Sequence, residues 1–153
     1  MQATVFLAGS RSIKTLHPEV KARLQQILDQ NLKIVMADNS GADKAFQQYL
    51  ADKDYREVYL TSTRWNPRNN IGRWSSSMVG GRNMRIKELN AFRDQSLSQN
   101  ADYAFILWNG TSEGTRGTIE EMIRQKKKTL VYFQKEKRFE LITEDNPLPE
   151  PQS

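Results

Sequence analysis

Short apolar runs alternate along the chain with segments in which apolar residues recur every three or four positions. The runs are rich in β-branched and aromatic residues and predict strands at residues 4–8, 33–37, 57–61, 103–108 and 129–133. After the first run, Val20, Leu24 and Leu28 repeat at helical spacing behind Pro18, a residue suited to the first turn of a helix. A helix is therefore predicted from Pro18 to about Asn31.

The same spacing predicts three more helices. The first of them carries Ala42, Phe46 and Leu50 on its apolar face. The next runs from about residue 82 to 97, and the last covers about residues 117–125. The inner face of the 82–97 helix is expected to hold four apolar side chains: Ile86, Leu89, Phe92 and Leu97.

Strands that alternate with helices predict an α/β fold: a Rossmann-like, doubly wound parallel sheet of about five strands with helices on both faces. The strand sequences are almost continuously apolar, as expected for strands buried on both sides. Ligands of such sheets bind beyond the carboxyl ends of the strands. The turns that follow the strands are therefore expected to converge at that edge.

A single domain is expected to span residues 1–140. Residues 62–81 form a polar connection that is long for a compact domain, and connections of this length are usually functional lids or disordered. From Glu144 onward the chain contains Pro147, Pro149 and Pro151, so residues 144–153 are expected to be disordered.

The composition excludes several kinds of chemistry. The chain of 153 residues has no cysteine and one histidine, His17, which excludes disulfides and thiolate catalysis and argues against a zinc site or a serine–histidine triad. No metal or cofactor is therefore expected. No apolar run approaches the roughly 18 residues of a membrane span. The N-terminus begins directly with a strand-like segment, so a cytoplasmic protein with no membrane partner is expected.

Positive charge is concentrated in one segment. The net charge is +5, yet residues 63–87 alone hold six cations and no Asp or Glu: Arg64, Arg68, Arg73, Arg82, Arg85 and Lys87. Trp65 and Trp74 lie among these cations. Such a segment either binds an anionic ligand whose bases stack on the rings, or keeps the protein soluble while the rings pack against the domain. The lysines at 126–128 are interpreted as a solvated helix end.

Two early turns offer groups for a phosphorylated ligand, and six residues are assigned to it there: Gly9, Ser10, Arg11, Ser40, Gly41 and Asp43. The glycines allow a ligand to approach the backbone, and Arg11 presents donors matched to phosphate. Ser40 can cap the helix that follows. Asp43 either stabilises the positive end of that helix or binds a ribose or base.

The glycine-rich turn after the run at 103–108 is the most informative part of the chain. It offers backbone N–H groups at the positive end of a helix, which suits a phosphate. The ligand-binding residues assigned here are Asn109, Gly114, Thr115, Gly117 and Thr118. Glu121 is either a solvated carboxylate or one that assists cleavage of an N-glycosidic bond, whereas its neighbour Glu120 should face away.

These motifs resemble the SLOG superfamily of Rossmann-like nucleotide-binding proteins, and in particular its short YspA-like branch (DUF2493). That branch carries G-S-R, G-A-D, R-N and W-D-G-x-S-x-G-T in this order, and residues 9–11, 41–43, 81–83 and 108–115 are similar to them. The resemblance covers residue 5 to about 133. It implies a nucleotide-derived ligand and adds Asn83 to the candidate site.

Residues 117–121 also resemble the G-T-x-x-E motif of the LOG phosphoribohydrolases. Those enzymes release a base from a nucleoside 5′-monophosphate with an arginine and that glutamate. The resemblance implies that Glu121 is the catalytic carboxylate and that Arg82 is its arginine.

Three functions are consistent with the sequence. The first is a nucleotide-binding pocket, either a hydrolase or a sensor without turnover. The second is a nucleic-acid-binding module that uses the basic segment with Trp65 and Trp74. The third is a partner-binding protein with a degenerate pocket. A homodimer is compatible with all three, although the sequence does not locate its interface.

Overall fold

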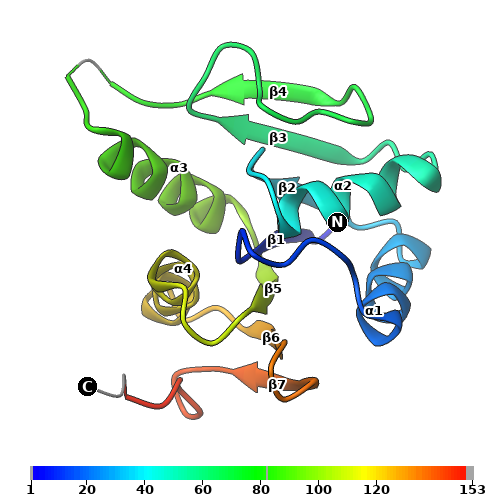
Figure 1. The fold of residues 1–153 in the computed structure, drawn as a ribbon, viewed down its shortest axis with the longest axis vertical. Coiled ribbons are helices and arrows are strands. Elements are labelled where there is room, and N and C mark those ends of the chain that lie inside the picture. The colour runs from blue at the N-terminus through cyan, green and yellow to red at the C-terminus, as the bar shows by residue number, and fades with distance from the viewer. Residues whose placement is uncertain (1, 82, 151–153) are drawn as a thin grey trace.

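The computed structural model describes residues 2–81 and 83–150 and confirms the predicted α/β fold (Figure 1). The strands within this described part are β1 (Thr4–Gly9), β2 (Lys33–Met36), β3 (Val58–Ser62), β4 (Ser75–Met78), β5 (Tyr103–Trp108), β6 (Thr129–Phe133) and β7 (Arg138–Ile142). The helices are α1 (Pro18–Asp29), α2 (Ala42–Asp52), α3 (Ile86–Asn100) and α4 (Glu113–Arg124).

The strands form one sheet in the order β4-β3-β2-β1-β5-β6-β7. All neighbours are parallel except β6 and β7. From β1 the chain winds outward through β2, β3 and β4, and then returns to β5 on the other side of β1. The winding therefore reverses between β1 and β5, and the turns after these two strands lie side by side at the carboxyl edge.

The core has two layers, one on each face of the sheet. Val5 and Leu7 pack with α1 and α2 on one face, whereas Phe6 packs with α3 and α4 on the other (Figure 1). This alternation follows from the two-residue period of a strand. It fixes both helix pairs against the sheet and thereby positions the loops that connect them.

The apolar pattern does not predict β4 or β7, which bring the sheet to seven strands within the described residues. The side chains of Ser75–Met78 are all exposed, so β4 has no buried face that would leave an apolar signature. Both strands lie at the edges of the sheet, where polar residues are tolerated. The connection at 62–81 is consequently not structureless, because it contains β4.

Helix α3 departs most from its predicted inner face. Ile86 is 73% exposed and Phe92 is 47% exposed, whereas Leu97 is buried. Arg93 is 1% exposed and takes the inward position next to Phe92. The helix begins at Ile86 rather than near residue 82. The predicted inner face was wrong because the pattern allowed only apolar side chains on the side of the helix that packs against the sheet.

The helix starts at the carboxyl edge also differ from those predicted. Ser40 does not cap α2: the N-cap is Gly41, which has φ +79° and no side-chain bond. A Cβ at Gly41 would lie 2.2 Å from the backbone oxygen of Arg11, so glycine is required by packing as well as by φ. Helix α4 begins at Glu113, earlier than predicted, because Ser112 accepts a hydrogen bond from the Thr115 backbone N–H.

The C-terminal segment packs against the domain as far as it is described. Leu148 is 8% exposed and belongs to the same apolar cluster as Trp108 and Phe133. The guanidinium of Arg116 donates to the backbone oxygen of Pro149. Residues 144–150 thus contact the domain through Leu148 and Pro149, and disorder of the tail at 144–153 stays a prediction. Residues 151–153 lie outside the described part.

Candidate functional site

A cleft of about 950 Å³ opens at the carboxyl edge of the sheet. Its walls come from the turns after β1, β2 and β5 and from α3 and α4. Binding sites for small molecules usually measure about 300–1,000 Å³, so this cleft has room for a nucleotide. It lies at the switch point between β1 and β5, where doubly wound sheets bind their ligands.

The structure brings the three predicted turns together around this cleft. The predicted site residues that line it are Gly9, Arg11, Asp43, Asn109, Gly114, Thr115, Gly117, Thr118 and Glu121. Ser10 and Gly41 are buried and do not line it, whereas Ser40 and Asn83 are exposed outside it. Arg82, the arginine implied by the LOG resemblance, lies outside the described residues.

Ser10 connects the turn after β1 to the start of α4. Its hydroxyl accepts a hydrogen bond from the Asn109 backbone N–H at 3.1 Å and shares another with the Thr115 hydroxyl at 3.1 Å. The Asn109 amide donates to Ser12 and accepts from the Ser112 backbone N–H. Because Ser10 is fully buried, its role here is to hold the two turns together.

The glycines of the cleft differ in what their missing side chains allow. A Cβ at Gly9 would lie 2.5 Å from the Ala42 Cβ and 2.8 Å from the Leu107 oxygen, so Gly9 is needed for packing. A Cβ at Gly114 or Gly117 would meet nothing within 4 Å. These two glycines leave the wall of the cleft open at the positive end of α4, where an anion is favoured.

This contrast predicts opposite effects on stability. We expect Gly117→Ala to raise the free energy of unfolding by up to about 1 kcal/mol, because alanine favours a helix and the new methyl group meets nothing. We expect Gly9→Ala to lower it by about 1–3 kcal/mol through overpacking. Urea unfolding of both variants measures the two changes. A destabilised Gly117→Ala variant would contradict the open wall at α4.

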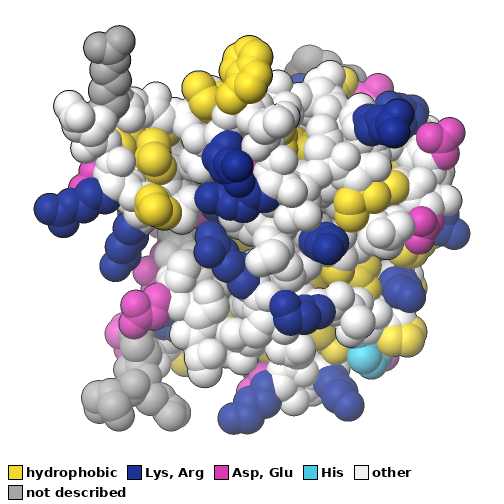
Figure 2. Space-filling view, turned by 45° about the horizontal axis from the view of Figure 1, so that its top comes forward, with side chains coloured by type: hydrophobic (Ala, Val, Ile, Leu, Met, Phe, Trp, Pro, Cys, Tyr) yellow, Lys and Arg dark blue, Asp and Glu magenta, His cyan; other side chains and the backbone are white. Residues whose placement is uncertain are grey.

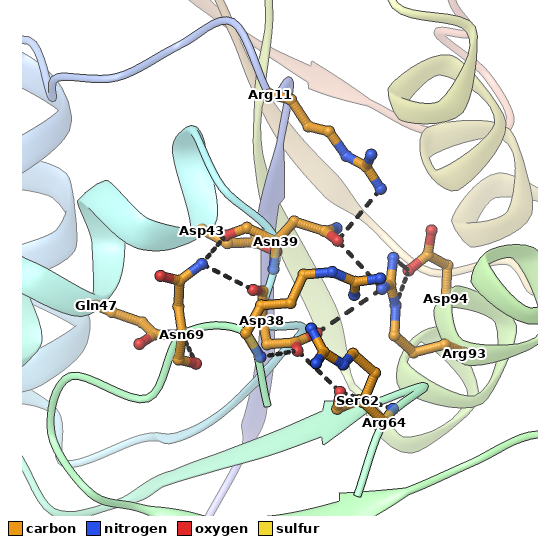
Figure 3. Close-up of polar contacts among 11 residues, drawn as sticks. Arg11, Asp38, Asn39, Asp43, Gln47, Ser62, Arg64, Asn69, Arg93 and Asp94 are labelled. Carbon is orange, nitrogen blue, oxygen red and sulfur yellow. Dashed lines mark hydrogen bonds and ion pairs between the residues drawn. The ribbon is translucent and has the colours of Figure 1, made fainter. Parts of the chain in front are cut away.

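Arg93 is the centre of a polar cluster in the wall of the cleft (Figure 3). Its Nε donates to Asp94 at 3.0 Å and its Nη1 donates to Asn39 at 3.2 Å. The same Nη1 lies 3.9 Å from Oδ1 of Asp38, an oxygen with no hydrogen bond within the described part of the chain. The sequence patterns did not identify Arg93 or Asp38 as parts of the site.

Burial shifts two carboxyl groups of this cluster. Burial raises the pKa of Asp43 well above 3.8, and the positive charge of Arg93 offsets only part of the rise. Burial also raises the pKa of Asp94, against the opposing charge and hydrogen bond of Arg93. The Arg93 guanidinium thus stands among three carboxyl groups, Asp38 being the third, and the charge of Arg11 acts more weakly on Asp94. Loss of the Arg93 guanidinium would remove most of the positive charge that compensates these carboxylates.

Asp38 also fixes the turn that carries Trp65. Its Oδ2 accepts hydrogen bonds from the Ser62 hydroxyl at 2.8 Å and from the Arg68 backbone N–H at 2.7 Å. Its backbone oxygen accepts from the Asn69 amide at 3.0 Å. Both ends of the turn at 63–67 are therefore tied to the carboxyl end of β2, and the turn projects from the same edge as the cleft.

The two tryptophans of the basic segment have different environments. Trp74 is 5% exposed, and its indole N–H donates to the Tyr55 backbone oxygen at 2.8 Å. Trp65 is 86% exposed. Packing therefore explains Trp74 and leaves Trp65 available as a surface for stacking.

Cations without carboxylate partners surround this part of the molecule. Within the described residues, no ion pair is formed by Arg11, Arg64, Arg68 or Lys87; Arg73 also forms none, but it precedes β4 at the opposite edge of the sheet. Figure 2 shows Lys and Arg side chains down the middle of the face in view, with Asp and Glu toward its margins. A surface of this kind attracts an anionic partner.

The two glutamates of α4 lie in different places. Glu121 lines the cleft, pairs with Arg124 and accepts a hydrogen bond from Gln125 at 3.0 Å. Glu120 is more exposed, pairs with Arg116 and does not line the cleft. Of the two carboxylates, Glu121 is thus the one that can reach a ligand bound in the cleft.

No metal site and no membrane span are found in the part of the chain that the structure covers. Among residues 2–81 and 83–150, no group of three or more His, Asp or Glu side chains could hold a metal ion. The helices in these ranges are too short or too polar to cross a membrane.

The same architecture occurs in a solved structure, that of DNA processing protein A from Helicobacter pylori, which was described for its single-stranded DNA binding mode. The TM-score is 0.63 at 17% sequence identity, and the match covers 84% of this chain. The two chains share a Rossmann-like fold. The matched region spans 64% of the length of that chain. No protein-family model and no curated protein matches the sequence.

Proposed function

We propose that this protein binds single-stranded nucleic acid at the carboxyl edge of its sheet. One nucleotide occupies the cleft, and its neighbours lie over the turn at 63–67 and the adjacent Arg68. The observation that carries the proposal is Trp65, which is 86% exposed between Arg64 and Arg68 on a turn fixed to that edge. Exposed aromatic rings among cations bind single strands, because bases stack on the rings while the cations hold phosphates.

The cleft and the basic turn have complementary roles in this proposal. The open wall at Gly114 and Gly117, with Arg11 on the opposite turn, suits one phosphate group. Trp65 supplies a stacking surface outside the cleft for an adjacent base. Together they suit a chain of nucleotides better than a single nucleotide, because a mononucleotide in the cleft would leave Trp65 and its arginines unused.

The shared fold supports the proposal, since DNA processing protein A binds single-stranded DNA. Membership of the SLOG superfamily is part of the same proposal. It rests on the motifs at 9–11, 41–43 and 108–115, and the Rossmann-like fold agrees with it.

The test removes two charges from the basic turn. We expect Arg64→Gln/Arg68→Gln to make the dependence of log K on log salt concentration shallower by about 1.4 for a single strand, because each lost phosphate contact contributes about 0.7. The backbone N–H groups that hold the turn remain. Fluorescence anisotropy measures the slope, and Lys21→Gln/Lys53→Gln serves as a control with the same change in charge. A slope equal to that of the wild type would exclude these arginines from the interface.

A second function, hydrolysis of the N-glycosidic bond of a bound nucleotide, is favoured by the position of Glu121 beside the open glycines of the cleft. If the protein releases a base, Glu121→Gln should slow the release by about 100-fold or more while nucleotide binding persists. Glu120→Gln is the control, because that residue lies outside the cleft. Base release is measured by mass spectrometry. Equal rates in Glu121→Gln and the wild type would remove this carboxylate from the mechanism.

A further inference from the structure

A second cavity, of about 470 Å³, lies at the opposite edge of the sheet, where the parallel strands begin. The cations that line it are Arg23 from α1 and Lys126, Lys127 and Lys128 from the turn between α4 and β6. They converge although α1 and this turn are far apart in the sequence. The run of three lysines is therefore more than a solvated helix end, because it forms one wall of a cavity.

The positive charge of this cavity is poorly compensated. Asp102 is the one carboxylate among the residues that line it, and its Oδ2 accepts a hydrogen bond from the Thr4 backbone N–H at 2.7 Å. Within the described residues, Arg23, Lys126 and Lys128 form no ion pair. These three side chains are exposed and remain available to an anionic ligand.

Lys127 has a structural role that separates it from its neighbours. Its ammonium group donates to the backbone oxygens of Ser98 and Gln99 at the carboxyl end of α3, at 2.7 and 3.0 Å. Burial lowers the pKa of Lys127 and the charge of Asp102 opposes this effect. Substitution of Lys127 would therefore disturb the end of α3, so the charge of the cavity is best tested at Lys126 and Lys128.

The floor of the cavity is apolar. It includes Tyr103, Leu130 and Leu141, and Leu141 is 47% exposed. A flat base can cover such a floor while the phosphates on either side reach the lysines, which is the combination that single-strand sites use. A small inorganic anion would use the lysines and leave the apolar floor exposed to water.

We propose that this cavity at the amino edge is a second contact for the phosphodiester backbone of single-stranded nucleic acid. Arg23, Lys126 and Lys128 bind the phosphates, and a base lies on Tyr103 and Leu141. The inference rests on the proposed function and adds a site to it. The strands between the two edges measure about 20 Å, at roughly 3.3 Å per residue. The two sites also lie on opposite faces of the sheet, so a short oligomer reaches one site and only a long one that passes around the sheet reaches both.

The test compares two oligomer lengths in Lys126→Asn/Lys128→Gln. Asparagine suits position 126, where φ is +61°, because its side chain tolerates the left-handed region. For a single strand of about 16 nucleotides, the salt dependence should become shallower by about 1.4, with weaker binding at low salt. For one of about 4 nucleotides, which the cleft and the turn with Trp65 accommodate together, binding should equal that of the wild type. Lys21→Gln/Lys53→Gln is the matched control, and Arg23→Gln is an independent variant if the double variant is less stable.

Several outcomes would overturn this inference. An unchanged slope for the long strand, while the wild type binds both lengths, would reject the second contact and leave the proposed function standing. If the site variant and the control lose the same affinity, the effect comes from the lower net charge of the protein and not from this cavity. Unchanged oligonucleotide binding with lost binding to vesicles of anionic phospholipid would assign the cavity to a lipid surface. A wild type that binds neither length would reject the proposed function together with this site.

Discussion

Replacing Arg93 by methionine is expected to lower the free energy of unfolding by about 3–5 kcal/mol at neutral pH, the cost of breaking a buried ion pair from one side. Arg93 is 1% exposed and is the guanidinium that pairs with both Asp38 and Asp94. Methionine fills a similar volume but removes the positive charge that pairs with these carboxylates and offsets the burial of the nearby Asp43, and only the more distant charge of Arg11 still acts on Asp94. The loss of the charge therefore decides the effect.

The loss of stability in the Arg93→Met variant should be smaller at acidic pH. The pKa of Asp43 and that of Asp94 are raised in the folded state, so each carboxyl binds its proton more tightly when folded. Each of these carboxyl groups makes a pH-dependent contribution to the free energy of unfolding between pH 3.8, its ordinary pKa, and its raised pKa in the folded state. Within this range the contribution grows as the pH falls and shrinks as the pH rises. Without Arg93 the folded values rise further, and protonation then neutralises the carboxylates that methionine cannot compensate.

Urea unfolding at pH 7 and pH 5 measures both parts of this prediction. Arg85→Met is the matched control, because Arg85 is exposed at the start of the same helix and its substitution should change stability by about 0.5 kcal/mol or less. An Arg93→Met variant within about 1 kcal/mol of the wild type at pH 7 would show that the buried cluster is not held by this charge.

The second large effect is expected at Trp65. Trp65→Ala should weaken binding of a single strand by about 1–3 kcal/mol, or roughly 5- to 150-fold, which is the usual value of one stacked base. The free energy of unfolding should stay within about 0.5 kcal/mol, because the side chain is 86% exposed. This combination would distinguish a binding surface from a ring that packs against the domain.

Two variants sharpen this prediction. Trp65→Phe should keep a large part of the affinity, because phenylalanine retains a ring on which a base can stack. Tyr59→Ala removes another partly exposed ring, on β3 and outside the basic turn, and should leave binding unchanged. Equal affinities of Trp65→Ala and the wild type, measured by fluorescence anisotropy, would exclude stacking on Trp65.

The strands could be predicted from sequence to the extent that they are buried. Residues 103–108 and 129–133 are apolar on both faces, and the structure has β5 and β6 there. Ser75–Met78 is exposed on every residue, so its pairing with β3 depends on backbone hydrogen bonds that leave no mark in the hydrophobic pattern. Strand β4 was missed for this reason.

The candidate site could be predicted only in part. The turns after β1, β2 and β5 were expected at one edge because parallel strands end together, and they line one cleft. Arg93 was missed because it stands four residues from both Leu89 and Leu97, in a position of the helix that the pattern reserves for apolar residues. Its partner Asp38 is distant in sequence, and only the fold brings the two together.

The sequence also could not show which of the two tryptophans is buried and which is exposed. Trp74 is buried in the same apolar cluster as Val58 and Leu60, and its indole N–H donates to the backbone oxygen of Tyr55, contacts that only the fold brings together. Trp65 lies on a turn that is held at both ends by Asp38, a restraint that is invisible in the local sequence. The composition therefore indicated an anionic partner, but it did not indicate which of the two tryptophan rings would contact that partner.

Binding of a labelled single strand of about 16 nucleotides to the wild-type protein across a range of salt concentrations, with a nucleoside monophosphate as competitor, tests the central claim most directly. Binding of the strand should be strong at low salt and log K should fall linearly with log salt concentration, while the monophosphate competes weakly because it contacts only the cleft. Tight, salt-insensitive binding of the monophosphate with no binding of the strand would contradict the account and would show that the cleft binds a single nucleotide.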